Sequence, residues 1–141
     1  KISMKKFFFL ILIIATLYPN LSVAKVDTKN SNEMFSWCKL WIRQNDGESI
    51  GQINMVKAIG CSWYFKGMFE SSLLIGVMDD IKTGKKSTQA KLNGVCAPIS
   101  ITPAQWVRVF VKYLNDNPQY LNRSVSINSA SALKKYYRCR R

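Results

Sequence analysis

The chain has 141 residues, with 21 lysines and arginines, 8 aspartates and glutamates and no histidine, so its formal net charge is +13. This length suits a single domain once an export signal is subtracted. The absence of histidine excludes Ser-His-Asp and Cys-His catalysis and every zinc site that needs a histidine ligand.

The N-terminal segment has the pattern of an export signal. Lys5 and Lys6 form a positive region, residues 7–17 form an almost unbroken apolar run, and Ser22-Val23-Ala24 supplies the small residues of a signal-peptidase site. The apolar run is well short of the ~20 residues that a membrane-spanning helix needs. We therefore expect a signal peptide at residues 1–24 that is cleaved near Ala24, with Met4 as the natural start.

The mature chain, residues 25–141, is expected to form one helical domain, because it contains no internal repeat and no low-complexity tract. Cleavage would remove three lysines and lower the net charge from +13 to +10. A basic domain suits nucleic acid, anionic lipid or an acidic protein partner, but export disfavours nucleic acid. The charge has a second interpretation, which is that it only keeps the protein soluble near a polyanionic envelope.

Four cysteines follow the signal segment, at Cys38, Cys61, Cys96 and Cys139. An even number of cysteines in a short exported chain predicts disulfides. No two of them form a C-x-x-C motif, which excludes a thioredoxin-like centre and a zinc knuckle. Four cysteines allow three pairings, and their spacing does not choose among them.

Two apolar segments come first in the mature chain. Residues 31–44 carry Phe35, Cys38, Trp41 and Ile42 at helical spacing and end at the turn signal Asn45-Asp46-Gly47. Residues 49–78 form a second helical segment. Its expected packing face is Ile53, Val56, Gly60, Tyr64, Gly67, Ser71, Leu74 and Met78. The small residues on that face would let another helix approach closely.

The stretch from Asp79 to Gly94 is polar and rich in lysine, and we expect it to be a long loop. The next helix has clear signals: Thr102 is an N-cap, Pro103 occupies the first helical position and Gln105 completes a capping box. Its apolar stripe is Trp106, Val109, Phe110, Tyr113 and Leu114.

Asn117-Pro118 ends this helix and is expected to begin a fourth one. The stripe of that fourth helix would be Leu121, Val125, Ala132 and Tyr136. A basic tail, residues 134–141, follows and contains Cys139. The predicted fold class is all-α, a small bundle of four to five helices with two intramolecular disulfides.

No G-x-S-x-G, Walker or G-x-G-x-x-G motif is present. A paired-carboxylate hydrolase stays formally open, with candidates Asp46, Glu48, Glu70, Asp79, Asp80 and Asp116. Several of these acids lie at turns or segment ends, where acidic residues are common. We therefore expect a non-enzyme without catalytic residues, metal or cofactor. The sequence does not decide between core packing and an interface for four aromatic residues, Trp37, Trp41, Trp63 and Tyr64.

A series of short motifs resembles the Rap/Tai family of periplasmic immunity proteins. It begins with a C-x-x-Y-x-x-G element at Cys61, Tyr64 and Gly67 and continues with Cys96-Ala97-Pro98 and Ile101-Thr102-Pro103-Ala104-Gln105. The series ends with Tyr113-Leu114, Asn117-Pro118 and Cys139. The resemblance covers about residues 35–139, and the order and spacing of the motifs are more specific than any one of them.

Studied members of this family protect bacteria from peptidoglycan amidases that siblings inject through a type VI secretion system. The resemblance implies an all-helical periplasmic protein, frequent homodimerisation, and inhibition by occluding the amidase active site. It also implies the disulfides Cys38–Cys61 and Cys96–Cys139. A longer lysine-rich segment after Gly67 and a basic tail past Cys139 depart from the family pattern, so the resemblance does not identify the effector.

Basic side chains are the candidate contacts with an effector, because they would be steered toward an acidic surface. They are Lys82, Lys85, Lys86, Lys91, Arg108 and Lys112. The alternative function is an envelope stress or chaperone-like binding protein with no amidase target.

Overall fold

The computed structural model describes residues 30–84, 89–92, 95–98 and 100–139. The expected signal peptide, Lys85 and Lys86 lie outside these residues. The elements in chain order are α2 (Asn32–Asn45), α3 (Gln52–Thr83), β1 (Gln89–Leu92), β2 (Val95–Pro98), α4 (Pro103–Asp116), the 3-10 turn η1 (Pro118–Tyr120) and α5 (Val125–Tyr136). The predicted all-α class is confirmed, with a short hairpin added.

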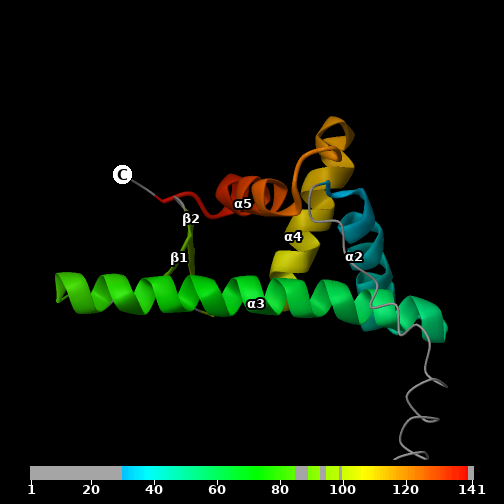
Figure 1. Ribbon diagram of the computed structural model, residues 1–141, viewed down its shortest axis with the longest axis horizontal. Coiled ribbons are helices and arrows are strands. Elements are labelled where there is room, and N and C mark those ends of the chain that lie inside the picture. The colour runs from blue at the N-terminus through cyan, green and yellow to red at the C-terminus, as the bar shows by residue number, and fades with distance from the viewer. Residues whose placement is uncertain (1–29, 85–88, 93–94, 99, 140–141) are drawn as a thin grey trace, which may run out of the picture.

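Helix α3 is the base on which the other elements are built. It has 32 residues and is therefore about 48 Å long. Figure 1 shows α2, α4, α5 and the hairpin on one side of it. Helices α2 and α4 pack against α3 directly, whereas α5 packs against α4 and β2. This one-sided arrangement leaves the opposite side of α3 without a neighbour among the described residues.

The predicted start of α4 is confirmed. The Thr102 hydroxyl accepts a hydrogen bond from the Gln105 backbone N–H at 3.2 Å, and the Gln105 side chain accepts one from the Thr102 backbone N–H at 2.8 Å. Pro103 lies at the first helical position, where its missing N–H costs nothing. The three signals act together, which is why this boundary could be predicted to the residue.

The expected loop from Asp79 to Gly94 is wrong at both of its ends. Helix α3 continues to Thr83, because its last turns contain no helix-breaking residue, and it ends at Gly84 with a left-handed φ of 66°. Residues 89–92 then pair with 95–98 as an antiparallel hairpin in which Leu92 lies opposite Val95. Because the segment is polar, it has no apolar periodicity from which the end of α3 or the hairpin could be predicted.

The beginning of the fourth helix also differs from the prediction. Pro118–Tyr120 forms only a 3-10 turn, and α5 begins at Val125 after Ser124, whose hydroxyl accepts a hydrogen bond from the Ile127 N–H. A buried asparagine explains the break. The Asn128 amide donates to the Ser31 hydroxyl at 2.8 Å and to the Tyr120 carbonyl at 2.7 Å, so the connection is held against the start of α2.

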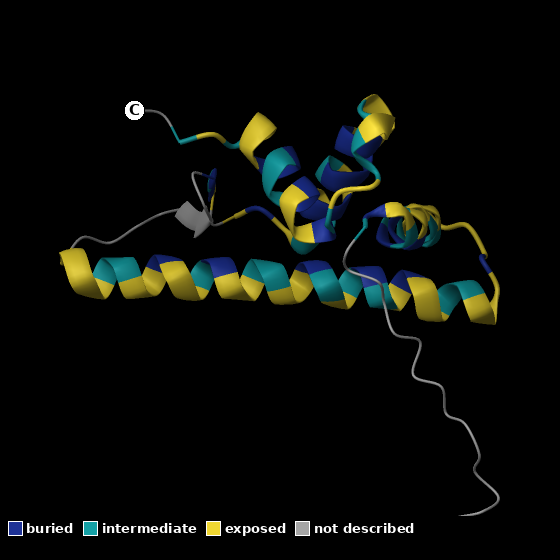
Figure 2. Cartoon of the chain, turned by 45° about the horizontal axis from the view of Figure 1, so that its top comes forward, coloured by how far each residue is buried: buried dark blue, intermediate teal, exposed yellow. Residues whose placement is uncertain are grey.

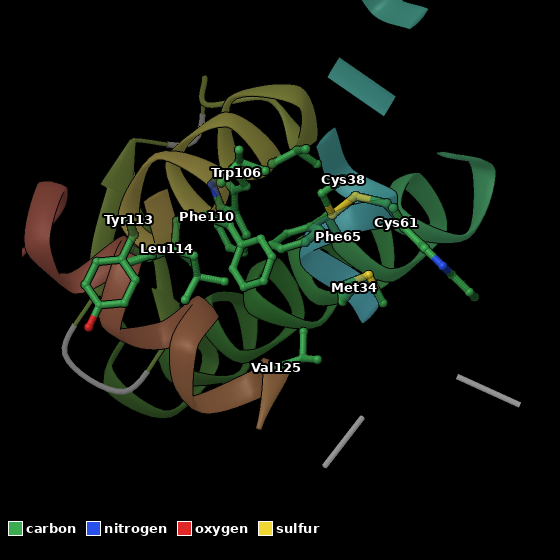
Figure 3. Close-up of a cluster of buried hydrophobic side chains, with 14 of the residues drawn as sticks. Met34, Cys38, Cys61, Phe65, Trp106, Phe110, Tyr113, Leu114 and Val125 are labelled. Atoms are coloured by element: carbon green, nitrogen blue, oxygen red, sulfur yellow. A yellow bond between two sulfur atoms is a disulfide. The ribbon is translucent and has the colours of Figure 1, made fainter. Parts of the chain in front are cut away.

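The core lies between α2, α3 and α4 and is completed by buried residues of β2 and α5 (Figure 3). Phe65 of α3 and Phe110 of α4 meet at 5.1 Å between ring centroids, and the Cys38–Cys61 disulfide lies beside them. The predicted stripe of α4 is confirmed for Trp106, Phe110 and Leu114, each of which is at most 1 % exposed. Core packing is therefore the role of the α4 aromatic residues.

The predicted packing face of α3 is wrong for four of its residues and right for two, because Gly60 lies against Trp37 of α2 and Tyr64 packs on the core. The residues that α3 buries are Ala58, Cys61, Phe65, Ser72 and Gly76. Ile53, Val56, Leu74 and Met78 of the predicted face are instead more than half exposed. Figure 2 shows the exposed residues along the side of α3 that faces away from the other elements. Both sides of this helix are apolar, and the protein covers only one of them.

Candidate functional site

The described residues contain no group of three or more histidine, cysteine, aspartate or glutamate side chains that could hold a metal ion. All four cysteines are oxidised, in the pairs Cys38–Cys61 and Cys96–Cys139 that the family resemblance implied. Among the described helices, none is both long and apolar enough to cross a membrane. The disulfides link elements that carry candidate contact residues, α3 through Cys61 and the hairpin through Cys96.

The second disulfide attaches the tail to the hairpin. Cys96 lies in β2, and its backbone N–H donates to the Tyr137 carbonyl at 2.7 Å, while Val95 forms a bridge with Arg138. The Cys96–Cys139 bond adds a covalent link across the same contact. The hairpin and the end of α5 are therefore joined, and β1, which contains Lys91, pairs with β2 in this hairpin.

The candidate contact residues fall in two separate places. Lys82 is exposed in the last turn of α3, and Lys91 belongs to β1 next to it, whereas Arg108 and Lys112 are exposed on α4. Figure 1 shows α4 away from the C-terminal end of α3. The structure therefore does not join the predicted residues into one basic patch.

Both α4 candidates are already paired with acids. Arg108 Nη1 donates to Asp46 Oδ2 at 3.3 Å, and Arg108 Nη2 donates to Asp46 Oδ1. The hydrogen bond from Arg108 lowers the pKa of the Asp46 carboxyl below its usual value. Lys112 Nζ lies 3.2 Å from an oxygen of Asp116. The net positive charge at this face is consequently smaller than the sequence suggests.

The Asp46–Arg108 pair joins the turn after α2 to α4 across 62 residues of sequence, and it predicts an effect of pH. The folded state binds the Asp46 proton less tightly than the unfolded chain does, so the pair stabilises the fold above the ordinary carboxyl pKa of about 4. That contribution is lost as the pH falls through the lower pKa of the folded state. Asp46→Asn should therefore reduce the free energy of unfolding at pH 7 and have little effect near pH 2, as measured by urea denaturation.

The matched control for this prediction is Asp116→Asn, because Asp116 and its partner Lys112 belong to one helix. It makes the same charge change without separating two elements, and we expect a smaller effect at pH 7. An Asp46→Asn variant that is equally destabilised at both pH values would contradict the prediction.

The sequence analysis missed a hollow between α2 and α3. It has a volume of about 390 Å³, and the residues that line it are Trp41, Gln44, Met55, Ala58, Ile59, Ser62, Trp63 and Lys66. Trp63 is 65 % exposed at its edge, and Lys66 Nζ lies 5.1 Å from the Trp63 ring centroid. The sequence did not decide whether the tryptophans pack in the core or lie at an interface. Trp63 is exposed, as an interface residue would be. The only sequence signal was the clustering of aromatic residues.

The sequence profile of the family described as Rap1a immunity proteins matches residues 30–139. This span includes every helix, both strands and both disulfides of the structure. No curated protein and no solved structure gives a significant match to the chain.

Proposed function

The chain belongs to the Rap1a immunity protein family, and from this premise we propose that it protects its host against a peptidoglycan amidase delivered by type VI secretion. It would act in the periplasm by binding the amidase and occluding the active site. The observation that carries the proposal is the family match over residues 30–139, which covers the whole described domain.

This mechanism requires a rigid docking surface and no proton transfer. Two disulfides connect the elements, with Cys38–Cys61 joining α2 to α3 and Cys96–Cys139 joining β2 to the tail. A scaffold that is ordered before binding loses less conformational entropy in the complex. The disulfides also suit an oxidising compartment such as the periplasm.

The end of α3 and the hairpin are the favoured contact region within the proposal. Lys82 and Lys91 belong to adjacent elements there, and Lys85 and Lys86 lie between them in the sequence. Arg108 and Lys112 of α4 are a second candidate region. Because each of these two has an acidic partner, an effector would have to displace Asp46 or Asp116 to use their charge.

Protection of bacteria from the amidase tests the proposal. The genes next to that of this chain would be searched for a peptidoglycan amidase, and the amidase found there would be produced in the periplasm of a host, with and without the chain carrying its own N-terminal segment. We expect lysis without the chain and growth with it, together with a stoichiometric complex in calorimetry and loss of peptidoglycan hydrolysis by the purified amidase.

Charge reversals would locate the contact region. Lys82→Glu with Lys91→Glu should weaken the complex by about 10–100-fold, in line with ~1.4–2.8 kcal/mol for two charged contacts. Lys39→Glu with Lys57→Glu, at exposed lysines of α2 and of the N-terminal part of α3, is the matched control and should leave affinity unchanged. If neither protection nor a complex is seen, the chaperone-like alternative becomes the better one, and suppression of aggregation of an unfolded client would then be measured.

Two further parts of the proposal concern the mature protein. We propose that residues 1–24 are removed on export, so that mass spectrometry of the periplasmic protein should give a chain that begins at Lys25. We also propose, from the family resemblance, that the protein acts as a homodimer.

A further inference from the structure

The hollow between α2 and α3 is a candidate ligand site that the proposed function does not use. Its volume is about 390 Å³, and pockets for small molecules typically measure roughly 300–1,000 Å³. Trp41 and Gln44 line it from the last two turns of α2, and Met55, Ile59 and Ser62 line it from one face of α3. Figure 1 shows α2 beside the N-terminal half of α3, and these two helices form the walls.

A second hollow continues the first one toward the start of α3. Its volume is about 330 Å³, and it shares Gln44 and Met55 with the first hollow and adds Ser49 and Gln52. Lys66, at the far end of the first hollow, lies 14 residues after Gln52, which is about 21 Å along α3. The two hollows together are here called the α2–α3 groove, and its length suits a chain-like ligand.

Gln44 gives the groove a hydrogen-bond acceptor that the protein itself does not use. The Gln44 Oε1 atom is buried and has no hydrogen-bond partner among the described residues. Buried polar atoms are nearly always paired, because an unpaired one destabilises the fold. Since the Gln44 side chain lines both hollows, a ligand with an N–H or O–H group in the groove can supply the missing donor.

Lys66 gives the groove a positive charge without an acid beside it. None of the described residues that line the two hollows is acidic, and Lys66 takes part in none of the salt bridges among the described residues. Its Nζ lies over the Trp63 ring, 5.1 Å from the centroid, and the Trp63 side chain is still 65 % exposed. A carboxylate bound by Lys66 would therefore lie next to an accessible indole.

The surface of the groove favours a sugar over a peptide. A sugar ring has an apolar C–H face, which packs on an indole such as Trp63, and a rim of polar groups, which bond to amide side chains such as Gln44 and Gln52. A bound peptide needs an exposed strand edge or a continuous apolar row. The walls of the groove are helices, whose backbone groups are bonded internally, and Gln44 and Ser62 interrupt the apolar surface.

We propose that the α2–α3 groove binds a glycan of N-acetylated amino sugars that carries carboxylates, which is the chemistry of peptidoglycan strands. The sugar face packs on Trp63, the carboxylate is bound by Lys66, and an acetamido N–H donates to Gln44 Oε1. The inference goes beyond the proposed function, because it shares with it only the export of the chain. It places the protein on the polymer that a peptidoglycan amidase cleaves.

Two disaccharides test the ligand chemistry. Protein exported under its own N-terminal segment, with its disulfides intact, is titrated by calorimetry with N-acetylglucosaminyl-N-acetylmuramic acid and with di-N-acetylchitobiose. Both sugars have two acetamido groups, but only the first has a carboxylate. We expect both to bind and the acidic one to bind about 10-fold more tightly, because it adds a charge-assisted hydrogen bond. The protein should also co-sediment with isolated peptidoglycan sacculi.

Substitutions in the groove test the site. Lys66→Gln should remove the preference for the acidic disaccharide and leave the affinity for the neutral one unchanged. Trp63→Ala should weaken binding of both by about 10-fold or more, and it spares the core because Trp63 is exposed. Lys57→Gln and Leu74→Ala are the matched controls, at exposed residues of α3 outside the groove, and should change neither affinity.

Gln44→Met separates the acceptor from a structural role. The substitution keeps the length of the side chain and removes the unpaired buried oxygen. We therefore expect the fold to become more stable to urea while the affinity for both disaccharides falls. A residue that served only the fold would not show opposite effects on stability and binding.

Three results would overturn the inference. The first is that neither disaccharide binds at millimolar concentration and the sacculi do not retain the protein. The second is binding with equal affinity for the two sugars, or binding that Trp63→Ala leaves unchanged. The third is a Trp63→Ala variant that loses the complex with the amidase and keeps its affinity for sugar, which would assign the groove to the effector.

The inference and the proposed function can fail separately. Protection against the amidase without any binding of sugar would count against the inference alone. Binding of the acidic disaccharide without protection would count against the proposed function alone.

Discussion

Replacing both Cys38 and Cys61 by alanine is expected to reduce the free energy of unfolding by about 3 kcal/mol or more. The bond closes a loop with a sequence separation of 23 residues, and the chain-entropy estimate for such a loop is ~3 kcal/mol. Both cysteines are 0 % exposed and lie beside Phe65, so the double alanine variant also loses packing in the core. Urea denaturation at a fixed protein concentration measures the change.

The other disulfide provides the comparison. Cys96–Cys139 closes a longer loop, with a separation of 43 residues, for which the same estimate is ~4 kcal/mol. Cys96 and Cys139 are only partly buried, however, whereas Val95 and Ala97 of β2 belong to the buried core. We therefore expect Cys96→Ala with Cys139→Ala to free the tail while β2 and the helices stay packed.

Hydrogen exchange distinguishes the two variants. Loss of Cys38–Cys61 should increase exchange throughout α2 and α3, and loss of Cys96–Cys139 should increase it mainly in the tail and the end of α5. If the variant with both Cys38→Ala and Cys61→Ala kept the same free energy of unfolding and the same hydrogen exchange, the Cys38–Cys61 bond would not stabilise the fold.

Local sequence signals predicted the elements whose boundaries depend on adjacent residues. The capping box at Thr102 and Gln105, the turn at Asp46-Gly47 and the α4 stripe are each determined within a few residues of chain, and each is confirmed. The disulfide pairing was not accessible in this way, because spacing leaves three pairings equal. The family resemblance supplied it.

The error on α3 has a physical cause. A periodic apolar stripe indicates that a helix face is covered, but it does not identify what covers it. Helix α3 has two apolar faces, and the sequence signal was stronger for the exposed face, because the core face includes small or polar residues such as Ala58, Ser72 and Gly76.

The candidate site was predictable in part. The lysines near the end of α3 could be found from composition, but the pairing of Arg108 with Asp46 depends on a contact between residues 62 positions apart. The hollow between α2 and α3 likewise depends on how two helices pack. Features that arise from tertiary contacts leave no periodic signal in the sequence. For this reason Trp63 could be named as a candidate, but its position at the edge of the hollow could not be predicted.

Phe65→Ala is expected to cause the largest loss of stability from a single substitution, about 3–5 kcal/mol. Phe65 is 0 % exposed and lies where α2, α3 and α4 meet (Figure 3). Its ring lies 5.1 Å from Phe110 and 5.4 Å from Tyr64, so truncation removes two aromatic contacts and leaves a cavity next to the Cys38–Cys61 bond. That bond limits how far α3 can shift to fill the space. Chemical denaturation of the oxidised protein measures the loss.

Two variants control for this prediction. Ile127→Ala also truncates an apolar side chain, but Ile127 is 55 % exposed on α5, and surface changes of this kind alter stability by about 0.5 kcal/mol or less. Phe65→Leu keeps most of the volume and should fall between the other two. If Phe65→Ala were as stable as Ile127→Ala, the packing of α3 on α4 would not be what holds the fold together.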